Sequence, residues 1–300
     1  MDPDSSPLIS VDRLAEWLEA SVPPIVIDLR WYLGRPGDGR RAFLDGHLPG
    51  AIFLDLDDDL ADLNGYGAPG RHPLPSPAAF AARMAEAGIG DGRRVVGYDD
   101  VGGWVAARLW WMLDNLGYGR RGIAGEWVGV LNGGIGAWTA SGRALETGEH
   151  ALPSASGGMH LGDAWRGVID RETLKSRLGD VTLLDARGAP RYRGEIEPVD
   201  PVAGHIPTAL SAPIDGNLDP SGTLKSLDAI RARYGELGIV EGAPGEVVIS
   251  CGSGTSATHH SLAMRAAGLP DPTLYVGSYS DWSRSGEPVA TGPEPGDPPR

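Results

Sequence analysis

The chain has 300 residues, of which 41% are hydrophobic and 22% charged, and this composition predicts a soluble globular protein of one large or two ordinary domains. Its formal net charge of −14 leaves no basic face for phosphates or anionic lipids, so we expect neither nucleic acid nor a membrane as a partner. The N-terminal residues, MDPDSSPLIS, lack the pattern of a signal peptide, and no stretch approaches the ~20 apolar residues of a membrane span, so we expect a cytoplasmic protein.

Four sequence landmarks occur twice in the same order, about 150 residues apart. The first copy reads PIVIDLR (24–30), DGHLPGAIFLDL (45–56), RRVVGYDDVGGW (93–104) and VLNGGIGAW (130–138). The second copy reads VTLLDAR (181–187), AGHIPTALSAPI (203–214), GEVVISCGSGTS (245–256) and YVGSYSDW (275–282). The chain is therefore predicted to contain one domain twice.

Each copy alternates short β-branched runs, such as 25–27 and 247–249, with amphipathic segments of helical period. This alternation predicts an α/β fold of two tandem domains, each a parallel sheet flanked by helices. Ser76 followed by Pro77 predicts the start of a helix, and Asp170 predicts another.

Composition also predicts the domain boundaries. We expect an N-terminal domain over residues 1–147, a polar linker over 148–163 and a C-terminal domain over 164–292. The proline-rich residues 293–300 are predicted to be disordered.

The one cysteine, Cys251, follows a predicted buried strand and precedes a turn and a helix that we expect after Gly254. The carboxyl ends of parallel strands form the ligand-binding edge of such a sheet. Gly252 and Gly254 let backbone N–H groups turn inward, and a helix N-terminus adds partial positive charge, so the setting favours an anionic, nucleophilic sulfur. The alternative is that Cys251 is only a small buried side chain.

Two other activities share this architecture. A phosphatase loop needs an arginine six positions after the cysteine, and that position is Ala257, so we reject this interpretation. Gly252, Gly254 and Ala257 also match the pattern of a dinucleotide-binding loop, but the acid that should follow the next strand is absent there, because Asp271 precedes it.

Alignment of the two copies places Asp99 opposite Cys251. Because an aspartate cannot act as a sulfur nucleophile, only the C-terminal domain is predicted to be catalytic, and the N-terminal domain is expected to be non-catalytic.

From about Leu8 to Thr291, these landmarks resemble the two-domain rhodanese family of sulfurtransferases. The loop CGSGTSA is similar to the mercaptopyruvate type of that family, whereas thiosulfate enzymes carry Arg and Lys at the positions held here by Gly252 and Ser253. The resemblance implies a sulfurtransferase, and we expect no cofactor.

The resemblance also implies roles for single residues. Arg191 in RYRGE matches the arginine that binds the anionic end of the donor. Asp57 in FLDLD and His72 in RHPLP match an aspartate and a histidine near the active site, where His72 would hydrogen-bond Ser253 and help to move protons. Without the resemblance, His72 would be read as an exposed turn residue.

The sequence departs from the family at three places. Val199 stands where mercaptopyruvate enzymes carry a second arginine, so half of the expected carboxylate clamp is missing. Thr255 and Ser256 replace the usual Val-Thr, and Thr208 replaces the glycine of GHIPGA. These departures bear on the donor more than on the reaction.

The predicted reaction is a double displacement through a persulfide on Cys251, which the N–H groups of the loop from Gly252 through Ser256 would stabilise. The donor would be a small anion, 3-mercaptopyruvate or thiosulfate, and the acceptor cyanide, a thiol or a thioredoxin-like protein. The alternative is a non-catalytic sulfur-carrier or binding module. His259 and His260 are adjacent on a helix and face different directions, so no metal site is predicted.

Overall fold

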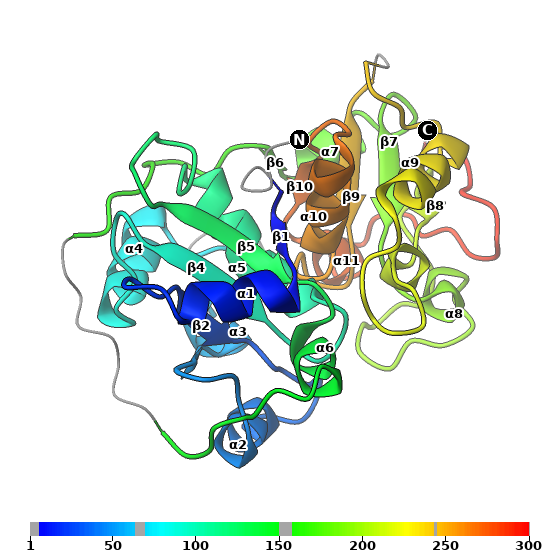
Figure 1. The fold of residues 1–300 in the computed structure, drawn as a ribbon. Helices are drawn as coiled ribbons and strands as arrows, with labels where there is room; N and C mark the ends of the chain where they lie inside the picture. Colours follow the sequence, from blue (N-terminus) through cyan, green and yellow to red (C-terminus); the bar gives the residue numbers. More distant parts are fainter. Residues whose placement is uncertain (1–5, 64–69, 150–157, 243–244, 300) are drawn as a thin grey trace. The chain divides into compact units, whose positions relative to one another are not determined.

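The computed structural model describes residues 6–63, 70–149, 158–242 and 245–299 (Figure 1). The chain divides into two compact units. In contrast to the predicted boundaries, Asp62–Leu74 belongs to the second unit and Pro220–Leu224 to the first. The first unit comprises Met1–Ala61, Pro75–Arg166 and Pro220–Leu224, and the second comprises Asp62–Leu74, Gly167–Asp219 and Lys225–Arg300. Half of the predicted linker, residues 150–157, lies outside the described residues.

The first unit contains a five-stranded parallel sheet in the order β1-β5-β4-β2-β3. Its strands are β1 (Leu8–Ile9), β2 (Ile25–Asp28), β3 (Ile52–Phe53), β4 (Arg94–Tyr98) and β5 (Trp127–Leu131). Its helices are α1 (Val11–Leu18), α2 (Asp38–Asp45), α3 (Leu56–Asp59), α4 (Pro77–Glu86), α5 (Trp104–Asn115) and α6 (Gly134–Ala140).

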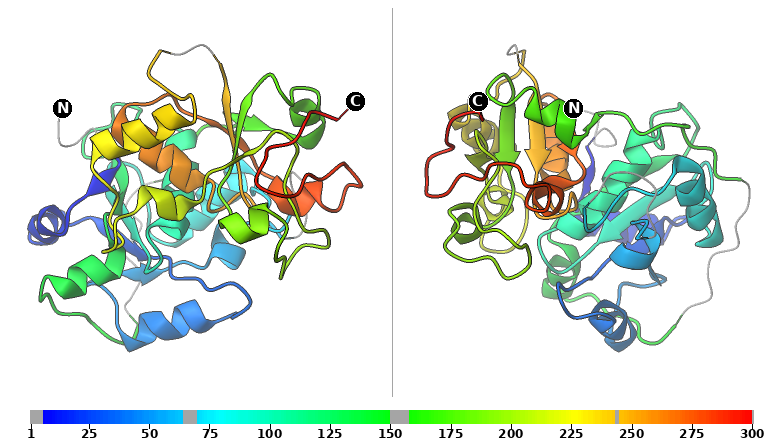
Figure 2. Two further views of the ribbon diagram at one scale, coloured as in Figure 1. Left: turned by 90° about the vertical axis from the view of Figure 1, so that its right-hand side faces the viewer. Right: turned by 180° about the vertical axis from the view of Figure 1, so that it is seen from behind.

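The second unit repeats this topology in the order β6-β10-β9-β7-β8, also parallel. Its strands are β6 (Val168–Ile169), β7 (Thr182–Asp185), β8 (Leu210–Ser211), β9 (Val247–Ser250) and β10 (Thr273–Tyr275). Its helices are α7 (Arg171–Lys175), α8 (Ala189–Tyr192), the 3-10 helix η2 (Ile214–Asn217), α9 (Leu227–Glu236), α10 (Thr258–Ala267) and α11 (Ser278–Trp282). Helices flank each sheet in both views of Figure 2, so the predicted α/β fold of two tandem domains is confirmed.

Burial explains why these runs form central strands. All residues of β2, β7 and β9 are buried or nearly so, and the strands pair in parallel, with Ile27 beside Gly97 and Leu184 beside Ile249. Strands covered on both faces are continuous hydrophobic runs, as the sequence shows. The predicted caps are also present: Ser76 Oγ accepts from Ala79 N–H at 3.1 Å, and Asp170 Oδ1 accepts from Thr173 N–H at 2.7 Å.

A buried aspartate–arginine pair follows the first long strand of each unit. Arg30 binds the Asp28 carboxylate and donates to Gly46 O at 2.6 Å, and Arg187 binds Asp185 and donates to Gly204 O at 2.6 Å. The same pair in both units, only one of which has a cysteine, supports a structural role.

Thr208, which replaces the glycine of the family pattern, has an unusual backbone conformation. Thr208 has φ 73°, and the glycine at the equivalent place in the first unit, Gly50, has φ 66°. This left-handed region is costly for a β-branched residue. The N–H of Thr208 donates to Pro295 O at 2.7 Å, a contact with the tail 293–300, whose disorder stays a prediction.

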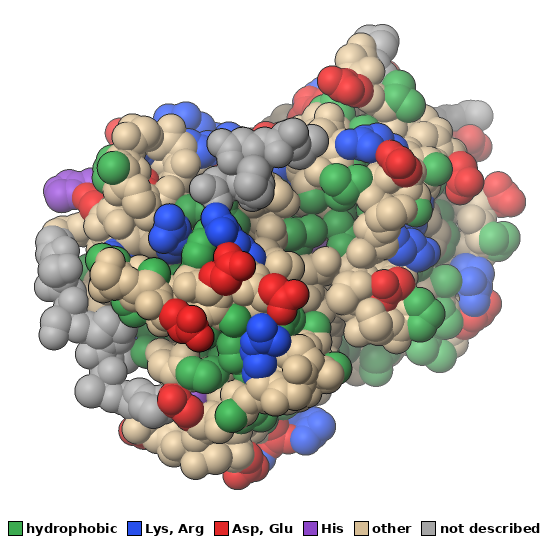
Figure 3. All heavy atoms as spheres, in the orientation of Figure 1, with side chains coloured by type: hydrophobic (Ala, Val, Ile, Leu, Met, Phe, Trp, Pro, Cys, Tyr) green, Lys and Arg blue, Asp and Glu red, His purple; other side chains and the backbone are tan. Residues whose placement is uncertain are grey.

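No helix in the described part of the chain is long and apolar enough to cross a membrane. On the face shown in Figure 3, basic side chains lie among acidic ones instead of forming a continuous region.

Candidate active site

The loop after β9 carries Cys251 at the carboxyl edge of the second sheet, where β9 lies between β10 and β7. Helix α10 begins at Thr258, later than the sequence predicts. The intervening residues form a tight turn in which Thr258 N–H donates to Thr255 O at 3.1 Å. The loop is therefore a separate element between strand and helix.

The sulfur of Cys251 is the centre of this loop. It is only 1% exposed, and Sγ accepts the N–H groups of Ser253 at 3.4 Å and Gly254 at 3.1 Å. Both donors point at the sulfur, so the loop is arranged for negative charge there. Ser256 lies farther along, where its carbonyl oxygen accepts from His259 N–H at 3.1 Å.

Gly254 is required by this geometry. Its φ is 78°, and a Cβ atom at this position would lie 2.4 Å from Val276 O. No other residue could present its N–H to Sγ without moving β10 or the loop.

Ser278, which the sequence analysis did not select, supports the loop from α11. It is fully buried and has φ 50°, a strained value for a residue other than glycine. Its hydroxyl accepts from Cys251 N–H at 3.1 Å and donates to Tyr275 O at 2.8 Å. The signal in the sequence is its place in the repeat, where Ser278 of YVGSYSDW stands opposite Gly134 of VLNGGIGAW, which has φ 56°.

His72 lies beside the loop. Its segment, Asp62–Leu74, belongs to the second unit. Its Nδ1 lies 2.7 Å from Ser253 Oγ and 3.4 Å from Thr255 Oγ1, and the side chain is buried. The structure thus places together His72, Ser253, Thr255 and Cys251. An imidazole that bonds a serine hydroxyl can pass a proton between ring and hydroxyl.

Arg191 lies in helix α8, in the same region. Its Nε and Nη2 donate to Glu197 at 3.2 and 2.7 Å, and Nη2 also reaches Asp200 Oδ2 at 3.3 Å. Burial disfavours the charged form of Glu197, but the hydrogen bonds from Arg191 and from the N–H groups of Asp200 and Val199, together with the charge of Arg191, outweigh it and keep the pKa of Glu197 below its ordinary value. The guanidinium is held by these carboxylates with Nη1 turned toward Gly252.

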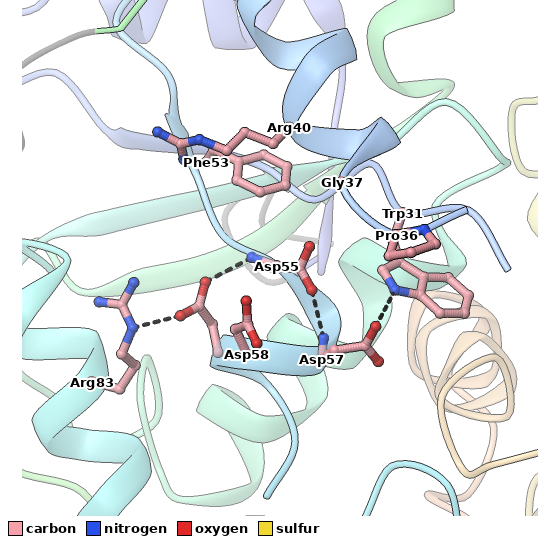
Figure 4. Close-up of a pocket in the computed structure, with 10 residues that line it drawn as sticks. Trp31, Pro36, Gly37, Arg40, Phe53, Asp55, Asp57, Asp58 and Arg83 are labelled. Carbon is pink, nitrogen blue, oxygen red and sulfur yellow. Dashed lines mark hydrogen bonds and ion pairs between the residues drawn. The ribbon is translucent and has the colours of Figure 1, made fainter. Parts of the chain in front are cut away.

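Asp57 belongs to the first unit, at helix α3. It accepts from Trp31 Nε1 at 2.9 Å and lines a pocket of about 410 Å³, shown in Figure 4. Neighbouring carboxylates and two arginines line the same pocket, where Arg83 binds Asp59 at 2.5 Å. Its predicted catalytic role therefore stays a prediction.

Asp99 occupies the equivalent loop of the first unit. Its carboxylate is fully buried and accepts the N–H groups of Val101, Gly103, Val105 and Ala106 at 2.7–3.1 Å. Burial raises the pKa of Asp99, and these four hydrogen bonds oppose that shift. The first unit thus fills its own loop with a carboxylate where the second holds a sulfur.

No group of three or more His, Cys, Asp or Glu side chains in the described residues could hold a metal ion. His260 instead bonds Tyr234 Oη through Nδ1 at 2.5 Å and Ala212 O through Nε2 at 2.9 Å, within the second unit. The chemistry that the site offers is a buried sulfur with backbone donors, an imidazole–hydroxyl pair and a guanidinium. This set suits nucleophilic attack on an anionic molecule.

Known proteins are similar to this chain over most of its length. The family model of the rhodanese-like domain matches residues 10–141 and 170–285. A Pseudomonas aeruginosa protein with the name "Probable 3-mercaptopyruvate sulfurtransferase" is 42% identical over 294 residues, which cover 96% of this chain and 99% of the relative. A Mycobacterium tuberculosis protein with the name "Putative thiosulfate sulfurtransferase SseB" is 40% identical over 279 residues, which cover 92% of this chain and 93% of the relative.

A solved structure shows the same fold. The 3-mercaptopyruvate sulfurtransferase SseA from Escherichia coli superposes with a TM-score of 0.74 at 29% identity, covering 91% of this chain and 99% of that one.

Proposed function

The chain belongs to the rhodanese-like family and is a sulfurtransferase, and from this premise we propose that it moves sulfur from a small anionic donor to a thiophilic acceptor through a persulfide on Cys251. The observation that carries the proposal is the pair of backbone N–H groups, from Ser253 and Gly254, directed at Sγ. The alternative of a non-catalytic sulfur carrier is not favoured, because the relatives with the same two domains are named as enzymes.

In the first step, the Cys251 thiolate attacks the sulfur of the donor. With 3-mercaptopyruvate, the carbon–sulfur bond breaks, and the carbon fragment leaves as the enolate of pyruvate, which takes up a proton. With thiosulfate, the sulfur–sulfur bond breaks and sulfite leaves. In either case Cys251 retains one extra sulfur, and the loop N–H groups stabilise the negative charge of this persulfide.

In the second step, an acceptor takes the outer sulfur. Cyanide attacks that sulfur, thiocyanate forms, and the electron pair of the sulfur–sulfur bond returns to Cys251 as a thiolate. A small thiol or a thioredoxin-like protein would act by the same displacement. The N–H donors of the loop support both steps, because each begins or ends with an anionic Sγ.

We propose that His72 and Ser253 transfer the proton that the enolate of pyruvate takes up. Their 2.7 Å separation lets the hydroxyl and the imidazole exchange a proton, which could then reach the departing enolate. We assign Asp57 a supporting role in the same step, as the family pattern implies. Arg191 is proposed to bind the anionic end of the donor.

We favour 3-mercaptopyruvate as the donor, with thiosulfate second. Gly252 and Ser253 give the loop no cationic side chain of its own, a pattern that the sequence shares with the mercaptopyruvate type of the family. Relatives named for either donor are similar to the chain, at 42% and 40% identity. A cytoplasmic location is also proposed, to be tested by cell fractionation.

The test is to incubate the reduced protein with each donor and measure its intact mass. We expect one added sulfur in the wild type and none in Cys251→Ser, because a serine hydroxyl does not ionise here, and turnover with cyanide should be lost in that variant. Retained turnover in Cys251→Ser would refute the persulfide mechanism. Faster turnover with thiosulfate would overturn only the choice of donor.

A further inference from the structure

We propose that Arg71 supplies the second guanidinium of the donor site, in place of the arginine that Val199 does not provide, and that Asp200 positions it. This inference rests on the proposed sulfurtransferase function and names a residue that determines how the donor binds. Sequence spacing does not point to Arg71, because it lies 128 residues before Val199.

Gly252, directly after the nucleophile, marks where the two guanidiniums meet. A Cβ atom at this glycine would lie 2.7 Å from Arg71 Nη2 and 3.6 Å from Arg191 Nη1. The three atoms nearest that point all belong to Arg71 and Arg191. Both cations therefore border the same side of the loop, one residue from Cys251.

The second observation is a shared anchor. Asp200 is buried, and its Oδ1 binds Arg71 Nη1 while its Oδ2 lies 3.3 Å from Arg191 Nη2. Arg284 reaches Asp200 Oδ1 at 3.1 Å and is half exposed. One carboxylate thus fixes the two guanidiniums relative to each other, as a preorganised anion site requires.

The charge of this cluster is not balanced. Four guanidiniums, of Arg71, Arg187, Arg191 and Arg284, bind three carboxylates, of Asp185, Asp200 and Glu197, so one positive charge remains. Arg71 Nη2 has no hydrogen-bond partner among the residues that the structure describes, and Nε is buried without one. An anionic group beside Gly252 would complete both the charge and the hydrogen bonds.

The position also bears on the donor. Arg71 brings a cation beside Gly252 from another segment of the chain. Because thiosulfate carries two negative charges and 3-mercaptopyruvate one, loss of Arg71 should weaken thiosulfate binding more.

A purely structural role is the competing explanation, since the Arg71–Asp200 ion pair also attaches segment Asp62–Leu74 to the second unit. The readout must therefore report charge beside Cys251 and not only activity. Iodoacetate is anionic and iodoacetamide is neutral, and both alkylate a thiolate. The ratio of their rates measures the local positive charge, whereas a change in thiol exposure alters both rates together.

The experiment measures this ratio in the full-length wild type, Arg71→Gln, Arg71→Lys and Arg284→Gln. We expect the ratio to fall about 3- to 10-fold in Arg71→Gln, to stay near the wild-type value in Arg71→Lys, and to change by less than about 2-fold in Arg284→Gln, which removes a cation from the same carboxylate. An unchanged ratio in Arg71→Gln, or an equal fall in Arg284→Gln, would overturn the proposal.

Steady-state kinetics provide the second arm. In Arg71→Gln we expect KM to rise about 10-fold for 3-mercaptopyruvate and more for thiosulfate, with a smaller change in kcat. A fall in kcat alone, with KM unchanged, would contradict a donor-binding role. If the wild type formed no persulfide with either donor, the proposed function would fail, while the alkylation ratio would still decide whether Arg71 places charge beside Cys251.

Discussion

Cys251 and Asp99 occupy the same place in two copies of one loop, and together they show what this loop does. In the first unit, four backbone N–H groups surround the Asp99 carboxylate, and in the second, two N–H groups reach Cys251 Sγ. The loop after the central strand therefore directs backbone N–H groups at one buried side chain in both units. In the first unit the Asp99 carboxyl group uses these N–H groups, so no site is left there for a reacting sulfur.

Thr208 leads to a prediction about stability, and the equivalent residue of the first unit, Gly50, provides its control. Its φ of 73° is unfavourable for a threonine, and its hydroxyl is buried without a partner among the described residues. We expect Thr208→Gly to raise the free energy of unfolding by about 1 kcal/mol, measured by urea denaturation, because relief of these two costs exceeds the entropy that glycine adds to the unfolded chain.

The control is Gly50→Thr at the equivalent place in the first unit. A Cβ atom at Gly50 meets nothing within 4 Å, so this change tests the backbone conformation alone. It should lower the free energy of unfolding by about 1–2 kcal/mol. A stable Gly50→Thr together with an unstable Thr208→Gly would show that the left-handed conformation is not the cost at these positions.

At the scale of elements, helix α10 is fixed by a buried polar contact. Tyr234 Oη donates to His260 Nδ1, and His260 Nε2 donates to Ala212 O, so the ring is held in one neutral form. Burial, aided by the nearby charge of Arg233, lowers the pKa of His260 to about 3. Protonation of this histidine is thus strongly disfavoured in the folded protein.

This shift predicts how stability depends on pH. In the unfolded chain the histidine has its ordinary pKa of about 6.5, so between pH 6.5 and 3 the unfolded state binds a proton that the folded state does not. The stability that His260 contributes is therefore present above pH 6.5 and is lost as the pH falls, by about 1.4 kcal/mol per pH unit. Urea denaturation between pH 7.5 and 4 would measure the slope.

The comparison is with His260→Gln, which does not titrate and can keep both hydrogen bonds. The variant should be less stable than the wild type at pH 7.5, and this difference should shrink steadily below pH 6.5. If the difference stayed constant down to pH 4, His260 would not be the group responsible.

The elements themselves were largely predictable from the sequence. The run Val247–Ser250 is a strand as predicted, and the caps at Ser76 and Asp170 are present. The sequence predicts too early a start for α10, because Gly254 adopts a left-handed conformation and the N–H groups of Ser253 and Gly254 donate to the sulfur instead of starting a helix. Helix propensity does not predict that backbone N–H groups will donate to a side chain instead of starting a helix.

At the scale of the whole molecule, the repeat in the sequence correctly predicted two parallel sheets with equivalent strand orders. It did not predict that segment Asp62–Leu74 belongs to the second unit. This segment has no periodic pattern that indicates a partner, and its contacts arise only in the folded chain. The sequence alone therefore does not mark Arg71 as a site residue, and it marks His72 only through the family resemblance.

The exchanged segment leads to a prediction about the isolated C-terminal half. A fragment of residues 164–300 contains Cys251, Ser253 and Arg191 but lacks Arg71 and His72, so the hydroxyl of Ser253 and the carboxylate of Asp200 each lose a partner. We expect kcat/KM of the folded fragment to be at least about 100-fold below that of the full chain, since both proton transfer and donor binding are impaired.

Full-length Arg71→Gln/His72→Asn provides the control, because it removes the same two side chains while it keeps every backbone segment. Its kcat/KM should fall to a similar extent, and circular dichroism of both proteins separates loss of function from loss of fold. If the folded fragment transferred sulfur at a rate near that of the full chain, segment Asp62–Leu74 would not be part of the site. If the double variant alone were fully active, neither side chain would take part, and the fragment's loss would come from missing backbone contacts such as the hydrogen bond from Arg71 N–H to Ser280 Oγ.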